Sequence, residues 1–321
     1  MDLFAIGTPV IDEFARVSGK ELSKLGVKKG ATNFFPASKI ASIERSLKKK
    51  ITYRYAGDNA RNVCEGFAAL GGFAGYSGAI GRDTAGAYFE NNLVECGVAS
   101  FLQVKRGVTG KIIALVTKEG ERTFCADLGV STECHEYEAV AVKESRMLFV
   151  ASITLIGGKP TAHLAYKYLQ EFAREKKRIA IALESPPMVR DHKTFLLACV
   201  KKYADVLFLN EDEADALLGK GAEKKLLTLK PSIPIYLKKG PHGSLVIQHG
   251  KAVHVPAMKT KVIDTTGAGD AYAAGVLDGM RRGFSPLSCA KRGCYLATKV
   301  VQKVGAGIPL RHTRLRIKHE R

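Results

Sequence analysis

Short apolar runs alternate with amphipathic stretches along the C-terminal two-thirds of the chain. Residues 147–152, 179–183 and 206–209 form apolar runs of strand length. A helix is predicted near 195–202. Another is predicted between the first two runs, where a set of apolar residues shares one helix face: Ala165, Tyr168, Leu169, Phe172 and Ala173. Strands separated by helices of this length predict β-α-β units and a mainly parallel sheet with helices on both faces.

Two segments interrupt this alternation. Residues 111–117 and 121–126 are rich in β-forming residues and flank a Lys-Glu-Gly turn, which predicts an antiparallel hairpin with no helix between its strands. A second interruption lies within residues 13–55. We expect a single domain over residues 1–321, in which segments within 13–55 and 98–128 form a β-sheet lid over a site.

The composition is that of a large globular protein. The chain has 321 residues, of which 46% are hydrophobic, and this is ample for a buried core. No apolar run approaches the roughly 20 residues that span a bilayer, and residues 1–7 resemble a first strand rather than a signal peptide. We therefore expect a cytoplasmic protein without membrane association. The 7 cysteines form no CxxC pair and are predicted to be reduced core residues.

The chain is strongly basic, with 50 Lys and Arg residues against 31 Asp and Glu residues and a formal net charge of +19. A basic balance favours anionic ligands. Most basic residues are scattered at the ends of predicted elements, where cations complement the helix dipole, so a solvated surface is favoured over nucleic-acid binding. The tail 311–321 is the stretch for which a nucleic-acid or partner role stays open.

The motif that carries candidate chemistry is Asp-Thr-Thr-Gly-Ala-Gly-Asp at 264–270, followed by a small, apolar helical stretch. Gly267 and Gly269 permit a tight turn into a helix start, where the N–H groups of Ala268, Gly269 and Asp270 would point outward as an anion hole. The Asp270 carboxylate at this helix start could accept the proton of an attacking hydroxyl. By itself the pattern fits equally well a glycine turn with a capping aspartate. No Walker phosphate loop is present elsewhere in the chain.

The whole motif closely resembles the signature of the ribokinase/PfkB carbohydrate kinase family. Further stretches that resemble family motifs are spread over nearly the whole chain, at 7–12, 57–62 with 70–71, 81–86, 210–213 and 238–243. Stretches most similar to the adenosine kinase-like branch are 25–30, 120–123 and 205–210. The resemblance implies a ribokinase-like three-layer α/β/α sandwich with a mainly parallel central sheet and a β-sheet lid.

The resemblance also implies ATP-dependent transfer of a phosphoryl group to a hydroxyl of a nucleoside, adenosine-like, or of a sugar. It makes Asp270 the catalytic base beside an anion hole of Gly267, Ala268 and Gly269. The residues that it implies for substrate binding are Asp12, Gly57, Asp58 and Asn62. Those implied for binding the nucleotide are Asn210, Lys238, Gly240, Gly243 and Thr265. Asn210 and Glu213 would organise Mg²⁺, and a monovalent cation (K⁺) is expected near Asp264.

Each of these residues also has a purely structural interpretation. Asn210 and Glu213 have the spacing of a helix capping box, which needs no metal. Asp12, placed at the end of the first strand, could be a turn residue, Asn62 a polar cap and Lys238 a solvated cation. Arg122, in the predicted hairpin, could reach into the site from the lid.

The chain departs from the family pattern at Asp58, which stands where the family has its second glycine. A carboxylate there could shrink the substrate pocket or bind an extra polar group, so we expect it to bear on substrate choice. The alternatives are a sugar or sugar-phosphate kinase of the same family, a catalytically inactive binding protein, and a nucleic-acid-associated protein. The choice between ATP and ADP as donor and between monomer and homodimer stays open.

Overall fold

The computed structural model describes residues 1–308 and is built around a nine-stranded sheet. In spatial order its strands are β14 (Lys251–Val255), β13 (Ser244–Gln248), β12 (Ile235–Lys238), β11 (Val206–Asn210), β10 (Arg178–Ala182), β9 (Met147–Ala151), β1 (Leu3–Ile6), β5 (Ala74–Gly81) and β6 (Ala99–Lys105). All neighbours are parallel except the β12–β13 and β13–β14 pairs at one edge. The predicted mainly parallel sheet is confirmed, with the apolar runs near 147, 179 and 206 as its central strands.

Helices cover both faces of this sheet, and each face has its own apolar core. One core joins the sheet to α3 (Asn59–Ala69), α4 (Thr84–Glu95), α12 (Ala268–Arg281) and α13 (Pro286–Val300). The other joins it to α5 (Ala139–Glu144), α6 (Ser152–Ile156), α7 (Lys159–Arg174), α8 (Pro186–Asp191), α9 (Lys193–Tyr203), α10 (Glu211–Leu218) and α11 (Ala222–Leu229). This three-layer unit is called the lobe below.

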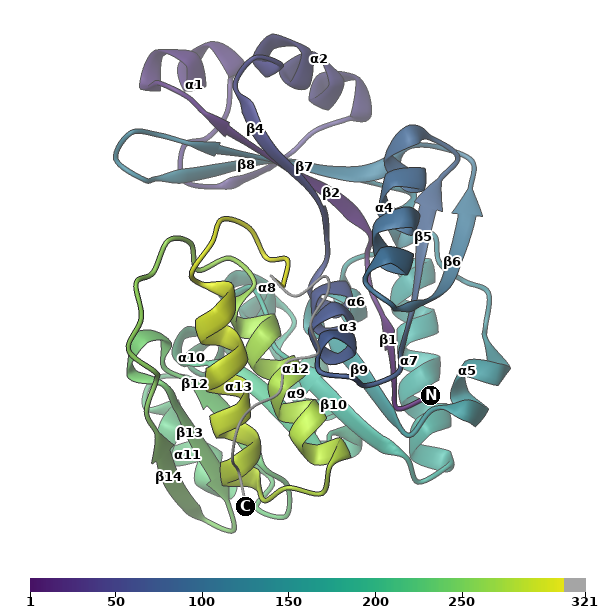
Figure 1. Ribbon diagram of the computed structural model, residues 1–321, viewed down its shortest axis with the longest axis vertical. Coiled ribbons are helices and arrows are strands. Elements are labelled where there is room, and N and C mark those ends of the chain that lie inside the picture. The colour runs from purple at the N-terminus through teal and green to yellow at the C-terminus, as the bar shows by residue number, and fades with distance from the viewer. Residues whose placement is uncertain (309–321) are drawn as a thin grey trace.

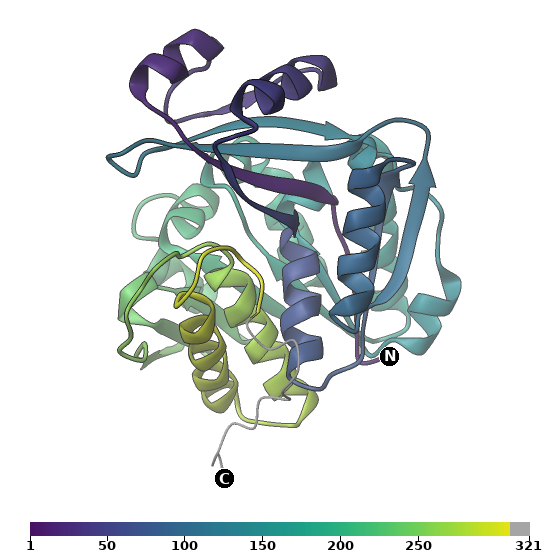
Figure 2. The same cartoon turned by 45° about the horizontal axis from the view of Figure 1, so that its top comes forward.

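A second, five-stranded sheet lies over one end of the lobe (Figure 1). Its order is β3 (Thr32–Phe34), β8 (Arg122–Gly129), β7 (Thr109–Val116), β2 (Val10–Arg16) and β4 (Ile51–Gly57). Both views show α1 (Gly19–Leu25) and α2 (Ala37–Leu47) on the side of this sheet turned away from the lobe (Figures 1 and 2). We call the sheet with these two helices the lid. The antiparallel pairing of β7 with β8 confirms the predicted hairpin.

The lid has a third apolar core of its own. It is formed by alternate residues of the lid strands and by buried residues of the two covering helices, among them Ala15, Leu22, Ile43 and Leu115. Because side chains alternate between the two faces of a strand, the remaining residues of β2, β7 and β8 face the lobe.

One expectation about the N-terminus is wrong. Asp12 does not end the first strand, because β1 stops at Ile6 and the Gly7-Thr8-Pro9 segment breaks the ladder before β2 begins at Val10. Proline has no N–H for a ladder hydrogen bond, so a strand cannot continue through it in the interior of a sheet. Asp12 is instead the third residue of the lid strand β2, opposite Tyr55 of β4.

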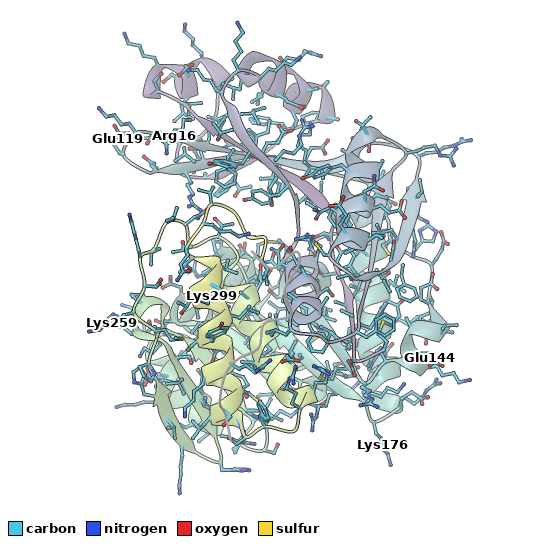
Figure 3. The ribbon with its side chains drawn as sticks, in the orientation of Figure 1. Arg16, Glu119, Glu144, Lys176, Lys259 and Lys299 are labelled. Carbon is cyan, nitrogen blue, oxygen red and sulfur yellow. The ribbon has the colours of Figure 1, made fainter. Side chains whose placement is uncertain are left out.

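The expectations about the cysteines and about the basic surface agree with the structure. All seven cysteines lie within residues 1–308, where none of them forms a disulfide, and six of them are buried. In the same residues, no helix is long and apolar enough to cross a membrane. Lys176 and Lys259 point outward from the surface (Figure 3), as expected of a solvated basic surface. The basic tail 311–321 lies outside the described residues.

Candidate active site

The predicted helix start at the glycine-rich motif is confirmed. Gly267 has a φ of 75° and is the N-cap of α12, which begins at Ala268. A Cβ on Gly267 would lie 2.5 Å from the Cβ of Ala306, so the position needs glycine for both its backbone angle and its space. The Ala268 N–H, expected to be free, donates to the Thr265 carbonyl at 3.2 Å and closes the turn. Within residues 1–308 the amides of Gly269 and Asp270 have no acceptor, so two of the three expected donors are free.

The Asp270 carboxylate stands at this helix start and is held by two amide groups of α3. Asn62 Nδ2 donates to Oδ2 at 2.9 Å, and Asn59 Nδ2 donates to Oδ1 at 3.2 Å. Burial raises the pKa of Asp270 to about 6, while the hydrogen bond from Asn62 and the charge of Lys238 act in the opposite direction. The group is therefore mostly ionised at neutral pH, yet basic enough to take a proton from a hydroxyl.

Asp12 lies against the backbone of Gly57, where the lid meets the lobe. A Cβ on Gly57 would lie only 2.0 Å from Asp12 Oδ2, so the close approach requires glycine. Burial, and after it the neighbouring charge of Asp58, raises the pKa of Asp12 to about 7. The structure thus brings together Asp12 and Gly57, two of the residues that the family resemblance implies for substrate binding.

Asp58 is turned into the protein scaffold. It is the N-cap of α3, with a φ of 148° that favours glycine, and its carboxylate accepts from the Arg61 amide at 3.0 Å. It also accepts from the Tyr76 hydroxyl at 3.0 Å, the Thr8 amide at 3.1 Å and the Thr8 hydroxyl at 3.3 Å. Only 8% of the residue is exposed, and burial raises its pKa. The carboxylate therefore accepts four hydrogen bonds from three residues of the protein.

Lys238, at the end of β12, lies beside the glycine-rich turn. Its Nζ would be 3.2 Å from a Cβ on Gly269, and it is 4.0 Å from Glu213 Oε2. This location next to the two free amides gives the anion hole a full positive charge. The lysine is partly buried rather than a fully solvated cation.

Asn210 and Glu213 form the expected capping box at the start of α10. Glu213 N donates to Asn210 Oδ1 at 2.8 Å, and Asn210 N donates to Glu213 Oε2 at 2.7 Å. The cap holds Glu213, which is 5% exposed, near Lys238 at the carboxyl ends of the strands.

The remaining residues assigned to the nucleotide lie on loops close to this end of the sheet. Gly240 begins a short 3₁₀ turn after β12 and Gly243 follows it, with φ of 53° and 88°. A Cβ on Gly243 would lie 2.1 Å from the Val255 carbonyl oxygen, so glycine is required there by packing as well. Thr265 is exposed, and its role in the turn is the carbonyl bond to Ala268.

Arg122 reaches from the lid strand β8 to the lobe, as expected. Its Nη2 donates to Asp264 Oδ1 at 3.1 Å and its Nη1 to Thr266 Oγ1 at 3.3 Å. Asp264 also accepts from the Gly305 amide at 3.0 Å and the Thr266 amide at 3.0 Å. These hydrogen bonds outweigh burial and lower the pKa of Asp264.

Two residues of the site are not among those predicted from the sequence. Asn59 precedes Asn62 by three residues on α3, and this spacing on one helix face could have predicted that both amides meet the same partner. Glu184 lies two residues after the end of β10, at the carboxyl end of the sheet where ligands bind in open α/β folds. Its Oε2 is buried without a hydrogen-bond partner in residues 1–308, and burial, followed by the charge of Asp270, raises its pKa well above the usual value.

The ribokinase-like fold and this arrangement define a class of protein: phosphotransferases that act on an alcohol group. A helix N-terminus with free amides, a lysine and a basic carboxylate meet at the carboxyl ends of the strands, under a lid. A family model described as pfkB family carbohydrate kinase matches residues 27–313. The chain belongs to this family.

Relatives within the family include both nucleoside and sugar kinases. Adenosine kinase from Saccharomyces cerevisiae is 28% identical, with 96% of each chain covered. 5-dehydro-2-deoxygluconokinase from Listeria monocytogenes is 27% identical over 81% of this chain and 85% of its own. The crystal structure of adenosine kinase from Sinorhizobium meliloti superposes with a TM-score of 0.84 at 26% identity, covering 95% of both chains.

Proposed function

We propose that this protein is an ATP-dependent kinase that transfers the γ-phosphoryl group to a hydroxyl of an adenosine-like nucleoside. Membership of the pfkB family and the similarity to adenosine kinases support the reaction and the donor. The observation that favours a nucleoside over a free sugar is the face of the lid that is turned toward the lobe.

This face is aromatic. The register of the lid strands brings five rings to the side opposite α1 and α2, and we call them the aromatic face: Phe14, Phe34, Tyr53, Tyr55 and Phe124. The Phe14 and Tyr55 ring centroids are 5.8 Å apart, and Phe34 and Tyr53 are 66% and 48% exposed. Exposed rings beside a ligand site are suited to stacking on a flat heterocyclic base, worth roughly 1–3 kcal/mol per base. A free sugar offers no such surface.

In the proposed reaction Asp270 accepts the proton of the attacking hydroxyl. Its ionised form is stabilised by Asn59 and Asn62, and its raised pKa makes it a stronger base than a solvent-exposed aspartate. The free amides of Gly269 and Asp270, with Lys238, neutralise the charge on the transferring phosphoryl group. Gly240, Gly243 and Thr265 border the nucleotide.

The proposed ribose site consists of Asp12, Gly57 and Asn62. The carboxylate of Asp12 is suited to accept hydrogen bonds from two neighbouring hydroxyl groups, and Gly57 allows a close approach of the backbone. Asp58 acts on this site from within the protein, because its carboxylate oxygens already accept hydrogen bonds from Thr8, Arg61 and Tyr76. We therefore expect Asp58 to influence substrate choice through the position of α3 rather than by direct contact.

The residues at the nucleotide side fit a magnesium ion. No group of three or more acidic, histidine or cysteine side chains within residues 1–308 has the arrangement of a metal site. However, Glu184 Oε2 is buried without a hydrogen-bond partner in the same residues. The charge of Lys238 acts on Glu184, and Glu213 lies beside this lysine. Mg²⁺ keeps several waters and leans on substrate phosphates, so two carboxylates and Asn210 would be enough to hold it. When bound, the ion would shield the negative charge of the phosphates.

A monovalent cation is not supported at the Asp264 side chain. That carboxylate is already neutralised by Arg122 and accepts backbone and hydroxyl hydrogen bonds.

The experiment that tests the proposed function is a coupled ADP-release screen over nucleosides, free sugars and sugar phosphates with ATP as donor. We expect adenosine or a close analogue to give the highest kcat/KM. In Phe14→Leu, the nucleoside KM should rise roughly tenfold because a stacking ring is lost, with kcat nearly unchanged. The matched control is Phe73→Leu, since Phe73 is 55% exposed but precedes β5 at the opposite end of the sheet. A preference for free sugars, unaffected by Phe14→Leu, would refute the nucleoside assignment.

A further inference from the structure

A buried arginine of α3, Arg61, is the centre of a polar network behind the proposed catalytic base. Arg61 is 3% exposed, and its Nη1 donates to Glu65 Oε2 at 2.7 Å, one helical turn away. Its Nη2 donates to Asn92 Oδ1 of α4. The same Nη1 donates to Asn62 Oδ1 at 3.1 Å. One guanidinium therefore touches both its own counter-ion and a residue of the site.

The contact with Asn62 determines which end of the Asn62 amide faces Asp270. The oxygen end accepts from Arg61, and the nitrogen end donates to Asp270 Oδ2 at 2.9 Å. The reverse orientation would aim the amide oxygen at a carboxylate and the amide NH₂ at a guanidinium, and both contacts would be repulsive. Because a guanidinium only donates, Arg61 permits one orientation.

We propose that Arg61 is a positioning residue for the Asp270 base, acting through the Asn62 amide. The inference rests on the proposed function in one respect only, which is that Asp270 is the base. Arg61 itself is paired with Glu65, so the two charges largely cancel at Asp270. We therefore expect Arg61 to act by orienting the Asn62 amide and not through the electric field of its charge.

A structural role for the ion pair does not account for these contacts. A buried Arg–Glu pair is often no more stabilising than apolar residues of the same volume, because desolvation offsets the attraction. What an apolar pair cannot do is donate to Asn62 Oδ1, which would then be free to turn. The Nε of Arg61 is also buried without a hydrogen-bond partner in residues 1–308, which costs stability.

Other groups also act on the charge of Asp270, and they must stay constant in a test. From β12, Lys238 lowers its pKa; from the α3 cap, Asp58 raises it. Glu184, after β10, interacts with Asp270 as well. Asn59 supplies the second amide of α3. A change at Arg61 leaves all four in place, so a change in the pKa of Asp270 can be assigned to Asn62.

The test measures the pKa of Asp270 directly in the free protein, by ¹³C carboxyl NMR with the resonance assigned through Asp270→Asn. The variant is Arg61→Met with Glu65→Gln, which removes both charges and keeps an acceptor for the Ile308 amide, now bonded to Glu65 Oε1. We expect the pKa to rise by about 1, as for the loss of one charge-assisted hydrogen bond. The acid limb of kcat should move by the same amount, with KM for ATP unchanged.

Two further variants make the result specific. In an Asn62→Ala background, the Arg61 and Glu65 changes should give no additional rise, because Arg61 acts through that amide. Arg61→Lys keeps the positive charge beside Glu65 but loses the planar guanidinium group, so it should still raise the pKa of Asp270. This variant replaces the double variant if the double variant does not fold. The control is Arg292→Lys: Arg292 is 5% exposed and bound to Asp278, and its loss should lower stability without moving the pKa.

An unchanged pKa of Asp270 in a folded Arg61 variant would overturn the proposal, and so would a rise that persists without Asn62. Because the titration needs no substrate, its outcome does not depend on the ADP-release screen. Failure of the screen would refute the proposed function while leaving the link between Arg61 and Asp270 measurable.

Discussion

Asp12 and Asp270, two aspartates of the candidate site, hold their protons unusually tightly. Burial raises the pKa of Asp270 to about 6 and that of Asp12 to about 7. Burial is the largest cause for both residues. The charge of Asp58 raises the pKa of Asp12 further, whereas the hydrogen bond from Asn62 lowers the pKa of Asp270. Both groups therefore change charge within a range of pH that is accessible to assays on the folded protein.

For Asp270 this leads to a prediction about rate. Asp270→Asn should lower kcat by roughly 100-fold or more, the order expected for loss of a general base, with KM for the nucleoside nearly kept. In the parent protein kcat should fall as the pH is lowered through about 6, because the base becomes protonated. Steady-state rates between about pH 5 and 8 measure both effects. Turnover close to the parent value in Asp270→Asn would contradict the role of base.

For Asp12 the prediction concerns stability. Its folded pKa of about 7 lies above the ordinary value of 3.8, so the fold prefers the protonated form and loses stability as pH rises between these values. Asp12→Asn removes this cost, and should raise the free energy of unfolding at about pH 8 by roughly 1–4 kcal/mol relative to the parent. Near pH 4 the gain should almost vanish.

Urea unfolding at the two pH values measures the gain in the free energy of unfolding in Asp12→Asn. In the same variant, KM for the nucleoside should rise because an acceptor for a hydroxyl group is lost. A gain of equal size at both pH values would show that Asp12 carries no buried charge. The expected pattern is that of a functional residue retained at the expense of stability.

At the scale of elements, α12, which carries the base and the anion hole, and α3, which holds the base through two amides, both begin in backbone conformations that favour glycine. α12 starts after Gly267 with a φ of 75°, and α3 starts after Asp58 with a φ of 148°. The first position has glycine. The second has an aspartate whose four hydrogen bonds offset the strain.

Gly267→Ala should therefore destabilise the protein by roughly 2–4 kcal/mol, since it adds backbone strain to a 2.5 Å contact with the Cβ of Ala306. The activity should fall further, because the amides of Gly269 and Asp270 would shift. The matched control is Gly283→Ala beyond the other end of the same helix. Gly283 has a φ of 77°, but a Cβ there would meet nothing within 4 Å, so only about 1 kcal/mol of strain is expected. Equal losses of stability in the two variants on thermal unfolding would refute the contribution of the contact with Ala306.

The regular elements could be predicted from the sequence because they follow from local spacing. The helix start at Gly267 and the capping box at Asn210 depend on residues within one turn, and both are confirmed. Asp12 was misplaced because the break at Pro9 sends β2 into a different sheet, which no local pattern reveals. The same holds for Glu184 and for the direction of the Asp58 side chain, which depend on partners far away in the chain.

At the scale of the whole molecule, the pair formed by Arg122 and Asp264 joins the lid to the lobe, and its partners are 142 residues apart in the chain. Arg122 also lies 6.0 Å from the Phe14 ring, on the aromatic face. We expect the lid to close over bound nucleoside and exclude water from the phosphoryl group. The pair would hold the closed arrangement.

Arg122→Met should therefore loosen the lid. Amide hydrogen exchange in β7 and β8 should become several-fold faster, and ATP hydrolysis without acceptor should increase relative to nucleoside phosphorylation. The control is Lys29→Met, which removes an exposed ion pair with Glu121 in the same lid but no contact with the lobe. If both variants behave like the parent, the lid is held by its other contacts alone.

The separate apolar core of the lid has a consequence for how this family diversifies. The rings proposed to recognise the acceptor belong to a sheet packed on its own two helices, whereas the glycine turn, Lys238 and Asp270 belong to the lobe. Mutations that reshape the lid need not disturb the packing beneath the phosphate cradle. A lineage can thus exchange one acceptor for another while inheriting its chemistry intact, which agrees with a chain similar to both an adenosine kinase and a 5-dehydro-2-deoxygluconokinase. Grafting the lid of one relative onto the lobe of another is the corresponding route to a kinase of new specificity.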